Sequence, residues 1–201
     1  MFVIVVSLTL FYVFFWFWYG GNGQPMSPQE IEEALGKLQS TDPARDNSAE
    51  IEDLRDLLAS DDGKEFVMQN LVRYRAKALY PEGSHFGDDP READKRYGKS
   101  IIGDLLRYGN LVIFIARKSG NFVTPDGADN WHYVAMVRYR SRRDFVRFAT
   151  RANQADKFMH KWAAIEKTHV FPVKPVISLF AVRTLLALAL FGLGMILTAL
   201  L

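Results

Sequence analysis

Residues 131–142 read Trp131-His132-Tyr133-Val134-Ala135-Met136-Val137-Arg138-Tyr139-Arg140-Ser141-Arg142. Their alternation predicts a strand over 131–140, with one face formed by Trp131, Tyr133, Ala135, Val137 and Tyr139 and the other by His132, Val134 and Met136. Directly after it, Ser141 and Asp144 have the spacing of a capping box, which begins a helix. The stretch therefore predicts a strand that is largely apolar on both faces and leads straight into a helix.

A second strand is predicted over 111–116, where Leu-Val-Ile-Phe-Ile-Ala is apolar throughout. Alternation would place Leu111, Ile113 and Ile115 on one face and Val112, Phe114 and Ala116 on the other. Strands that are apolar on both faces are typical of a sheet covered on both sides.

Two crossover helices can cover only one face of such a sheet, so the other face needs a second layer. A second copy of the same sheet would supply it, which predicts a homodimer with the sheets face to face. The alternative is that the chain's own early helices cover this face.

This part of the chain contains two further predicted strands, over 66–74 and 168–173. Its predicted helices span 90–108, begin at residue 142, and span 155–165. Gly109 ends the first of these helices. Together with the two strands above, the order is β-α-β-β-α-β. The sequence therefore predicts an α+β domain over residues 66–175.

An acidic segment over residues 20–65 precedes this domain. Between residues 20 and 66 there are 12 acidic and 4 basic side chains, whereas residues 67–175 carry 11 acidic and 20 basic ones. The segment contains two amphipathic helix signatures, one beginning with the capping box Ser27-Pro28-Gln29-Glu30 and one capped by Ser48. Because their charge is opposite to that of the domain, we expect these helices to pack on it.

Both ends of the chain are apolar. Residues 1–19 contain no charged side chain, and residues 176–201 contain only Arg183. A helix of this length is roughly 28 Å long, which is enough to cross the hydrocarbon core of a membrane. The aromatic run 14–19 and the glycine run 20–23 are typical of an interfacial end. A cleaved signal peptide would need a basic start and a small-residue cleavage site, and the sequence has neither.

Two membrane spans would place both termini on one side of the bilayer and the domain on the other. The second span is preceded or opened by Lys157, Lys161, Lys167, Lys174 and Arg183, whereas the terminal tails carry no basic side chain. The positive-inside rule then predicts a membrane protein with its domain in the cytoplasm and both termini outside. The sequence contains no cysteine, which agrees with this location and excludes a disulfide-stapled fold or a cysteine-bound metal.

Three polar residues are candidate catalytic side chains. Asn70 lies among apolar neighbours, so its amide would orient a ligand or bond neighbouring backbone. His132 would act as a base near neutral pH or be a hydrogen-bonded core residue. Tyr97 would donate its hydroxyl into the same space or simply pack. Trp131 and His85 are candidate ligand contacts, with core packing and a solvated loop histidine as alternatives. No metal site is expected, because the sequence has no helical histidine pair or carboxylate cluster.

Four arginines, Arg140, Arg143, Arg147 and Arg151, fall near one face of the helix that begins after residue 141. They would contact the acidic helices or anionic lipid headgroups, or form an ordinary solvated face. No nucleic-acid partner is expected, because no recognisable motif with interleaved aromatics accompanies them. The sequence also lacks a glycine-rich phosphate loop and a nucleophile elbow.

Several of these stretches carry a family resemblance. They are Val67-Met68-Gln69-Asn70-Leu71-Val72-Arg73-Tyr74, Arg96-Tyr97-Gly98, residues 131–142 and Phe145. Over about 61–173 the chain resembles the dimeric α/β-barrel (ferredoxin-like) superfamily. It is most similar to an uncharacterised branch with an Asn-Leu first strand, a Tyr-Gly helix and a Tyr-Pro-Ser-Arg strand end. Arg140 departs from that branch by replacing the proline, and His132 stands where the branch often has an acidic residue.

The resemblance implies a ferredoxin-like fold whose ligands bind between the sheet and the helices. The superfamily includes cofactor-independent monooxygenases, haem-degrading enzymes, chlorite dismutase-like proteins and dehalogenase- or isomerase-like members. Membrane spans at both ends are unusual for it.

Two functions are predicted as alternatives, and neither requires a cofactor. The first is a membrane-anchored module that binds a small molecule or a partner protein, as an accessory subunit of a membrane complex. The second is a cofactor-independent oxygenase or isomerase acting on an apolar substrate, in which Asn70 and Tyr97 polarise the substrate and His132 moves a proton. An enclosed cavity reached by all three side chains would favour the enzyme, and a filled interior the binding role.

Overall fold

The computed structural model describes residues 1–20, 23–39, 48–176 and 181–200. Gly21 and Asn22 of the predicted glycine run lie outside these ranges, and so does the side chain of the predicted cap Ser48. The described helices are α1 (Phe2–Tyr19), α2 (Pro28–Gln39), α3 (Ser48–Ala59), α4 (Pro90–Arg107), α5 (Arg142–Ala152), α6 (Ala155–Ala164) and α7 (Val182–Ala199).

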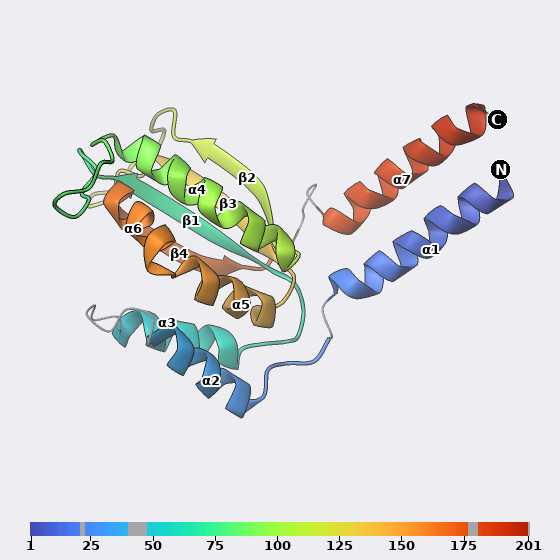
Figure 1. The fold of residues 1–201 in the computed structure, drawn as a ribbon, viewed down its shortest axis with the longest axis horizontal. Helices are drawn as coiled ribbons and strands as arrows, with labels where there is room; N and C mark the ends of the chain where they lie inside the picture. The colour runs from blue at the N-terminus through green and yellow to red at the C-terminus, as the bar shows by residue number, and fades with distance from the viewer. Residues whose placement is uncertain (21–22, 40–47, 177–180, 201) are drawn as a thin grey trace.

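One antiparallel sheet is formed by β1 (Phe66–Tyr74), β2 (Leu111–Arg117), β3 (Tyr133–Tyr139) and β4 (Ile165–Val173), in the order β2-β3-β1-β4. Helix α4 connects β1 to β2, and α5 with α6 connects β3 to β4 (Figure 1). This is the β-α-β-β-α-β connectivity of a ferredoxin-like fold, with the second helix divided in two. The predicted α+β class is confirmed.

Two strands begin at positions other than those predicted. Strand β4 begins at Ile165 instead of residue 168, directly after α6, because Ile165 is buried beside Val72 and pairs with Tyr74. Strand β3 begins at Tyr133 instead of residue 131. Pairing with β1 decides both limits, and the local sequence pattern does not contain that information.

Strand β2 contains a β-bulge that the sequence pattern does not reveal. Its register against β3 shifts between Val112 and Phe114. An extra residue in one strand interrupts the alternation of side chains. Leu111 and Phe114 consequently point to one side of the sheet, and Val112 and Ile115 point to the other. The prediction is therefore wrong for Leu111 and Ile115, which lie on opposite faces, and for Val112 and Phe114, whereas Phe114 and Ala116 share a face as predicted.

One face of the sheet is covered by helices and holds the main core. Phe66, Met68 and Tyr139 of the sheet pack against Leu105 of α4 and Phe148 of α5. A second cluster continues this layer and consists of Val72, Ala78, Ala93, Ala163, Ala164 and Ile165. Burial of a large apolar side chain contributes about 1.5–3 kcal/mol. This layer is therefore a main source of the domain's stability.

The acidic helices α2 and α3 extend the helical layer beyond α5 (Figure 1). Leu35 and Leu58 pack with Val146 of α5, and Leu57 reaches the main core. The expectation that these helices pack on the basic domain is confirmed. Because they lie on the same side of the sheet as the other helices, the alternative in which they cover the opposite face is wrong for the described residues.

The opposite face of the sheet is much less covered. Its central side chains are Gln69, Leu71, Val134, Met136 and Phe171, and we call them the open face. All five are partly exposed. None of them belongs to a hydrophobic cluster of the described residues. Apolar area on this face remains available to a further layer.

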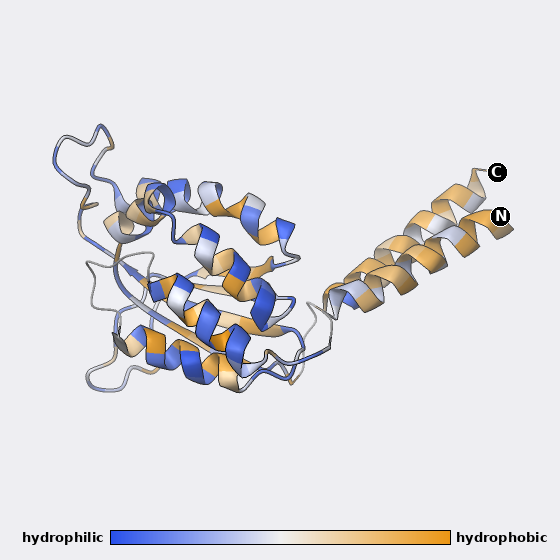
Figure 2. Ribbon diagram, turned by 60° about the horizontal axis from the view of Figure 1, so that its bottom comes forward, coloured by the Kyte–Doolittle hydropathy of each residue, from blue (hydrophilic) through white to orange (hydrophobic). Residues whose placement is uncertain are grey.

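Helices α1 and α7 lie side by side and antiparallel, and they project away from the domain with both termini at the far end (Figure 1). Both are apolar along almost their whole length (Figure 2). Each is long and apolar enough to cross a membrane. The core helix of a soluble protein can have the same length and hydropathy. A core helix would be mostly buried. In α1, however, only Tyr19 is buried, and α7 has no buried residue.

An ion pair attaches α2 to α5. The Arg143 guanidinium donates to the two carboxylate oxygens of Glu30 at 2.8 and 3.0 Å. The Ser27 N–H donates to the same carboxylate at 2.7 Å, which confirms the predicted capping box. These two donors, Arg143 first, lower the pKa of Glu30 from 4.5 to about 2.

This ion pair predicts a pH dependence of stability. Because the folded-state pKa of Glu30 is the lower one, its contribution is present above about pH 4.5 and is lost as the pH falls toward 2. We expect Glu30→Gln to be less stable than the wild type at pH 7 and equally stable near pH 2, in denaturant unfolding followed by fluorescence. The difference should be small and decrease with salt, since the Glu30 side chain is 44% exposed. The control is Glu33→Gln on the same helix, since no ion pair of the described residues involves Glu33; matching profiles for the two variants would contradict the prediction.

Candidate functional site

A polar cluster lies between α4 and the sheet. The Tyr74 hydroxyl donates to Asp94 Oδ2 at 2.8 Å, and the Tyr133 hydroxyl donates to Asp94 Oδ1 at 3.4 Å. The centres of the two tyrosine rings, one on β1 and one on β3, are 5.4 Å apart. The start of α4 is defined by Asp89, whose carboxylate accepts the Arg91 N–H at 2.8 Å. We call Asp94, Tyr74 and Tyr133 the Asp94 cluster.

The electrostatics of the Asp94 cluster follow from its burial. Burial raises the pKa of Asp94, although the hydrogen bonds from the two tyrosines act in the opposite direction. Burial, together with the Asp94 carboxylate, also raises the pKa of Tyr74 and of Tyr133. The cluster thus contains an acid that keeps its proton to higher pH than an exposed aspartate, beside two phenols that stay neutral over a wider range. Such a group can hydrogen-bond a polar ligand or move a proton.

Two of the predicted catalytic residues lie on the same side of the sheet as this cluster. Tyr97 follows Asp94 by three residues on α4, and burial together with the Asp94 charge raises the pKa of its hydroxyl. Asn70 is on β1, where its Nδ2 donates to the carbonyl oxygens of Met68 at 3.3 Å and Ala135 at 3.4 Å. The amide nitrogen of Asn70 thus bonds neighbouring backbone, which is one of the two roles that the sequence left open.

His132, the third predicted catalytic residue, bonds the main chain beside the start of β3. Its Nδ1 accepts the Tyr74 N–H at 2.9 Å, and its ring stacks on the Tyr74 ring with centres 5.7 Å apart. Because Nδ1 accepts, the proton of the neutral imidazole is on Nε2. The side chain is exposed. In the described part of the chain, no hydrogen bond joins His132 to Asn70 or Tyr97.

The two predicted ligand contacts lie elsewhere. Trp131 is partly buried, with Lys167 Nζ 6.0 Å from its ring centre. His85 is exposed in the connection between β1 and α4, with its ring 4.3 Å from that of Phe86. Phe86 also contacts His160 of α6, with ring centres 4.8 Å apart. His85 therefore belongs to an aromatic group at the end of the domain that carries this connection.

The four predicted arginines all bond carboxylates. Arg140 and Arg147 bond Asp144, Arg143 bonds Glu30, and Arg151 bonds Asp104. Of these four, Arg143 is the one whose carboxylate lies on an acidic helix. Arg142, which the sequence pattern does not single out, donates to Asp61 and Asp62 just after α3.

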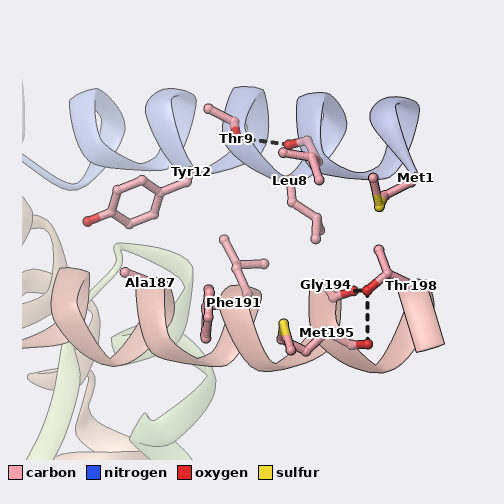
Figure 3. Close-up of a pocket in the computed structure, with 11 residues that line it drawn as sticks. Met1, Leu8, Thr9, Tyr12, Ala187, Phe191, Gly194, Met195 and Thr198 are labelled. Atoms are coloured by element: carbon pink, nitrogen blue, oxygen red, sulfur yellow. Dashed lines mark hydrogen bonds between the residues drawn. The ribbon is translucent and has the colours of Figure 1, made fainter.

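Two hollows of the described residues lie along α7. One is a groove of about 470 Å³ between α1 and α7, lined by residues that include Leu8, Tyr12, Phe191 and Gly194 (Figure 3). The other, of about 270 Å³, lies between β2 and the start of α7. Neither is lined by a predicted catalytic residue. Among the described residues, no group of three histidine, aspartate or glutamate side chains is placed to hold a metal ion.

Comparison with known proteins concerns the fold. No protein-family model and no curated protein matches the chain. The chain is similar to the crystal structure of a protein of unknown function from Rhodopseudomonas palustris, with 26% identity, a TM-score of 0.53, and coverage of 60% of this chain and 88% of that chain. The methylated form of that protein has 27% identity and a TM-score of 0.53, over 59% of this chain and 86% of that chain.

A third similar structure is a dabb family protein with a ferredoxin-like fold from Mesorhizobium loti. It has 12% identity and a TM-score of 0.35, over 56% of this chain and 98% of that chain. The chain is accordingly an α+β protein with a four-stranded antiparallel sheet and structural neighbours of unknown function.

The sequence reasoning missed Asp94, Tyr74 and Tyr133 as a group. The sequence places Tyr74 and Tyr133 in predicted strands, but it does not show that β1 and β3 are neighbours, with Tyr133 opposite Val72 and its ring next to that of Tyr74. The one available signal was the spacing of Asp94 and Tyr97, which puts both on one face of the predicted helix. A buried carboxylate is rarely left without partners, so an aspartate on the inner face of that helix indicates hydrogen-bond donors on the sheet.

The Asp94 cluster predicts a second pH dependence, opposite in sign to that of Glu30. Because the folded-state pKa of Asp94 is raised, ionisation destabilises the fold as the pH rises from the unfolded-state value through the raised one. We expect Asp94→Asn to gain stability relative to the wild type over this interval, measured by denaturant unfolding at successive pH values. Asp104→Asn is the matched control. Hydrogen bonds from Lys157 and Arg151 lower the pKa of Asp104, so this variant should lose stability relative to the wild type as the pH rises. The same sign for both variants would contradict the assignment.

Proposed function

We propose that this chain is a membrane-anchored module in which α1 and α7 cross the bilayer as an antiparallel pair and hold the ferredoxin-like domain at the cytoplasmic face. The observation that carries this proposal is the exposure of two almost wholly apolar helices, side by side, outside the domain core (Figure 2). In water such an exposed apolar surface would drive aggregation, whereas lipid tails cover it without cost.

The ends of the two helices nearest the domain support the same proposal. Trp16 and Trp18 lie in the last turn of α1, and Arg183 lies in the first turn of α7. Tryptophan and arginine are typical of the boundary between hydrocarbon and water. The cytoplasmic orientation rests on the basic side chains that precede α7, with the positive-inside rule as its physical basis.

We further propose that the domain forms a homodimer through the open face. Leu71, Val134, Met136 and Phe171 present apolar area on this face, and no hydrophobic cluster of the described chain includes them. A second copy of the sheet, packed face to face, would bury this area by an isologous contact.

The binding or interaction role is favoured over catalysis by the state of the predicted catalytic residues. The Asn70 amide nitrogen and His132 Nδ1 are both engaged with the main chain, so neither atom is free to act on a substrate. The alternative, a cofactor-independent oxygenase or isomerase, draws its support from Asp94. This carboxyl group has a raised pKa and lies beside two phenols, as a proton-transferring group would require. A ligand of either class would bind between α4 and the sheet.

Anchoring and orientation are tested together by labelling with a membrane-impermeant maleimide, because the chain has no cysteine of its own. We expect Leu200→Cys, near the far end of α7, to be labelled in intact cells. Glu82→Cys, in the exposed connection between β1 and α4, should be labelled only after permeabilisation. The reverse pattern would overturn the orientation. Recovery of the chain in the soluble fraction, or its failure to float with phosphatidylcholine vesicles, would overturn the anchor.

The dimer is tested by light scattering on the full chain in detergent micelles. We expect a dimer for the wild type and a monomer for Met136→Lys, because a charge in the centre of the open face would be buried without a partner. Ile102→Lys, which places the same charge on the exposed side of α4, should remain dimeric. A monomeric wild type, or a dimeric Met136→Lys variant with unchanged scattering, would contradict the proposal.

A further inference from the structure

Cationic and aromatic side chains gather where α1 and α7 approach the domain. Three of them, Trp16, Trp18 and Tyr19, end α1; Arg183 opens α7; and Arg138 and Arg140 lie at the end of β3 and just after it. We call these six residues the collar. In the proposed orientation it lies at the level of the lipid headgroups, because it is formed at the ends of α1 and α7 that are nearest the domain (Figure 1).

Two of the collar arginines lie over tryptophan rings. The Arg140 guanidinium carbon is 4.6 Å from the centre of the Trp18 ring, and that of Arg183 is 4.6 Å from the Trp16 ring. Gly109 allows the first contact, since it has φ +69° and a Cβ there would be 3.0 Å from the Trp18 ring. Stacking on aromatic faces holds a guanidinium in place while leaving its N–H groups able to donate.

Several polar atoms of the collar are buried and lack a hydrogen-bond partner among the described residues. They are Tyr19 Oη, Arg138 Nε and Arg183 Nε. Tyr19 is only 1% exposed and Arg138 only 6%. A buried polar atom without a partner costs about 1–3 kcal/mol, and nearly all such atoms in proteins are satisfied. These atoms give the collar hydrogen-bonding capacity that no described residue uses.

The net charge of the collar indicates the charge of the group that would bind there. Four charged side chains act electrostatically on the Tyr19 hydroxyl: Arg138, Arg140, Arg183 and Glu65. Arg138 is paired with Glu65 at 2.8 Å, and Arg140 is paired with Asp144 at 2.7 Å. No ion pair of the described residues involves Arg183, so its charge is not balanced within the collar. An anion is the complementary partner.

We propose that the collar binds the phosphate group of an anionic membrane phospholipid. The inference rests on the proposed membrane anchor and adds the lipid class that the anchor recognises. A phosphate accepts hydrogen bonds from both Tyr and Arg donors, and the uncompensated positive charge favours a headgroup without an ammonium group. A lipid is favoured over a soluble phosphate, because the collar adjoins apolar helices that would contact its acyl chains.

The test compares the full chain in nanodiscs of phosphatidylcholine alone with the chain in nanodiscs of phosphatidylcholine and phosphatidylglycerol at about 4:1. We expect the thermal midpoint, followed by circular dichroism, to be at least about 4 °C higher with phosphatidylglycerol, because a ligand of the folded state stabilises it. Tyr19→Phe and Arg183→Gln should each lose most of this increment. Arg91→Gln, an exposed arginine at the opposite end of the domain, should keep it.

Tyr19→Phe is the sharper of the two variants. It removes a hydroxyl that has no partner, so it should fold at least as well as the wild type in phosphatidylcholine and differ only in its response to phosphatidylglycerol. An unchanged response would overturn the inference, and so would an equal loss in Arg91→Gln. Inorganic phosphate added to phosphatidylcholine nanodiscs should give no increment; if it reproduces the increment, the ligand is a soluble phosphate.

The failure of this inference is distinguishable from failure of the anchor. A chain that does not enter phosphatidylcholine nanodiscs contradicts the proposed function itself. A chain that enters them and unfolds at the same temperature in both lipid mixtures contradicts only the headgroup site.

Discussion

The arrangement of the domain depends on a buried carboxylate, that of Asp144. It is 2% exposed and accepts hydrogen bonds from Ser141, Arg140 and Arg147. Asn110, which is completely buried, bonds the Asp144 carbonyl oxygen at 3.4 Å and accepts the Arg140 N–H at 3.2 Å. These bonds join the end of β3, the start of α5 and the segment before β2 at one point. Because an unpaired carboxylate would be very costly there, the group holds its neighbours in one arrangement.

The hydrogen bonds of Asp144 fix the direction in which α5 leaves the sheet. That direction decides which face of the sheet is covered. Helix α5 turns its Phe148 to the sheet and its Val146 to the acidic helices. The acidic helices are thereby placed on the helical side, together with α4 and α6. The open face is left with apolar side chains, while the Asp94 cluster is enclosed between α4 and the sheet. The proposed partner surface and the proposed ligand site thus lie on opposite sides of one sheet.

The hydrogen-bonded group around Asp144 also connects the domain to the apolar helices. Arg140 bonds Asp144 on one side and lies on the Trp18 ring on the other. A change at the end of α1 therefore has a direct physical route to the start of α5, through a charged hydrogen bond and an aromatic contact. Arg140 thus contacts both the end of α1 and the start of α5.

Much of this molecule is determined by local sequence. The capping boxes at Ser27 and Ser141, the apolar ends, the limits of β1 and the order of the elements follow from short-range patterns that the structure contains. Tertiary structure decided what depends on pairing across the sheet. The bulge in β2, the early start of β4 and the side on which α2 and α3 pack are examples. It also decided the candidate site, because Asp94, Tyr74 and Tyr133 are brought together by burial and strand register, and neither leaves a signature in residues that lie far apart in the chain.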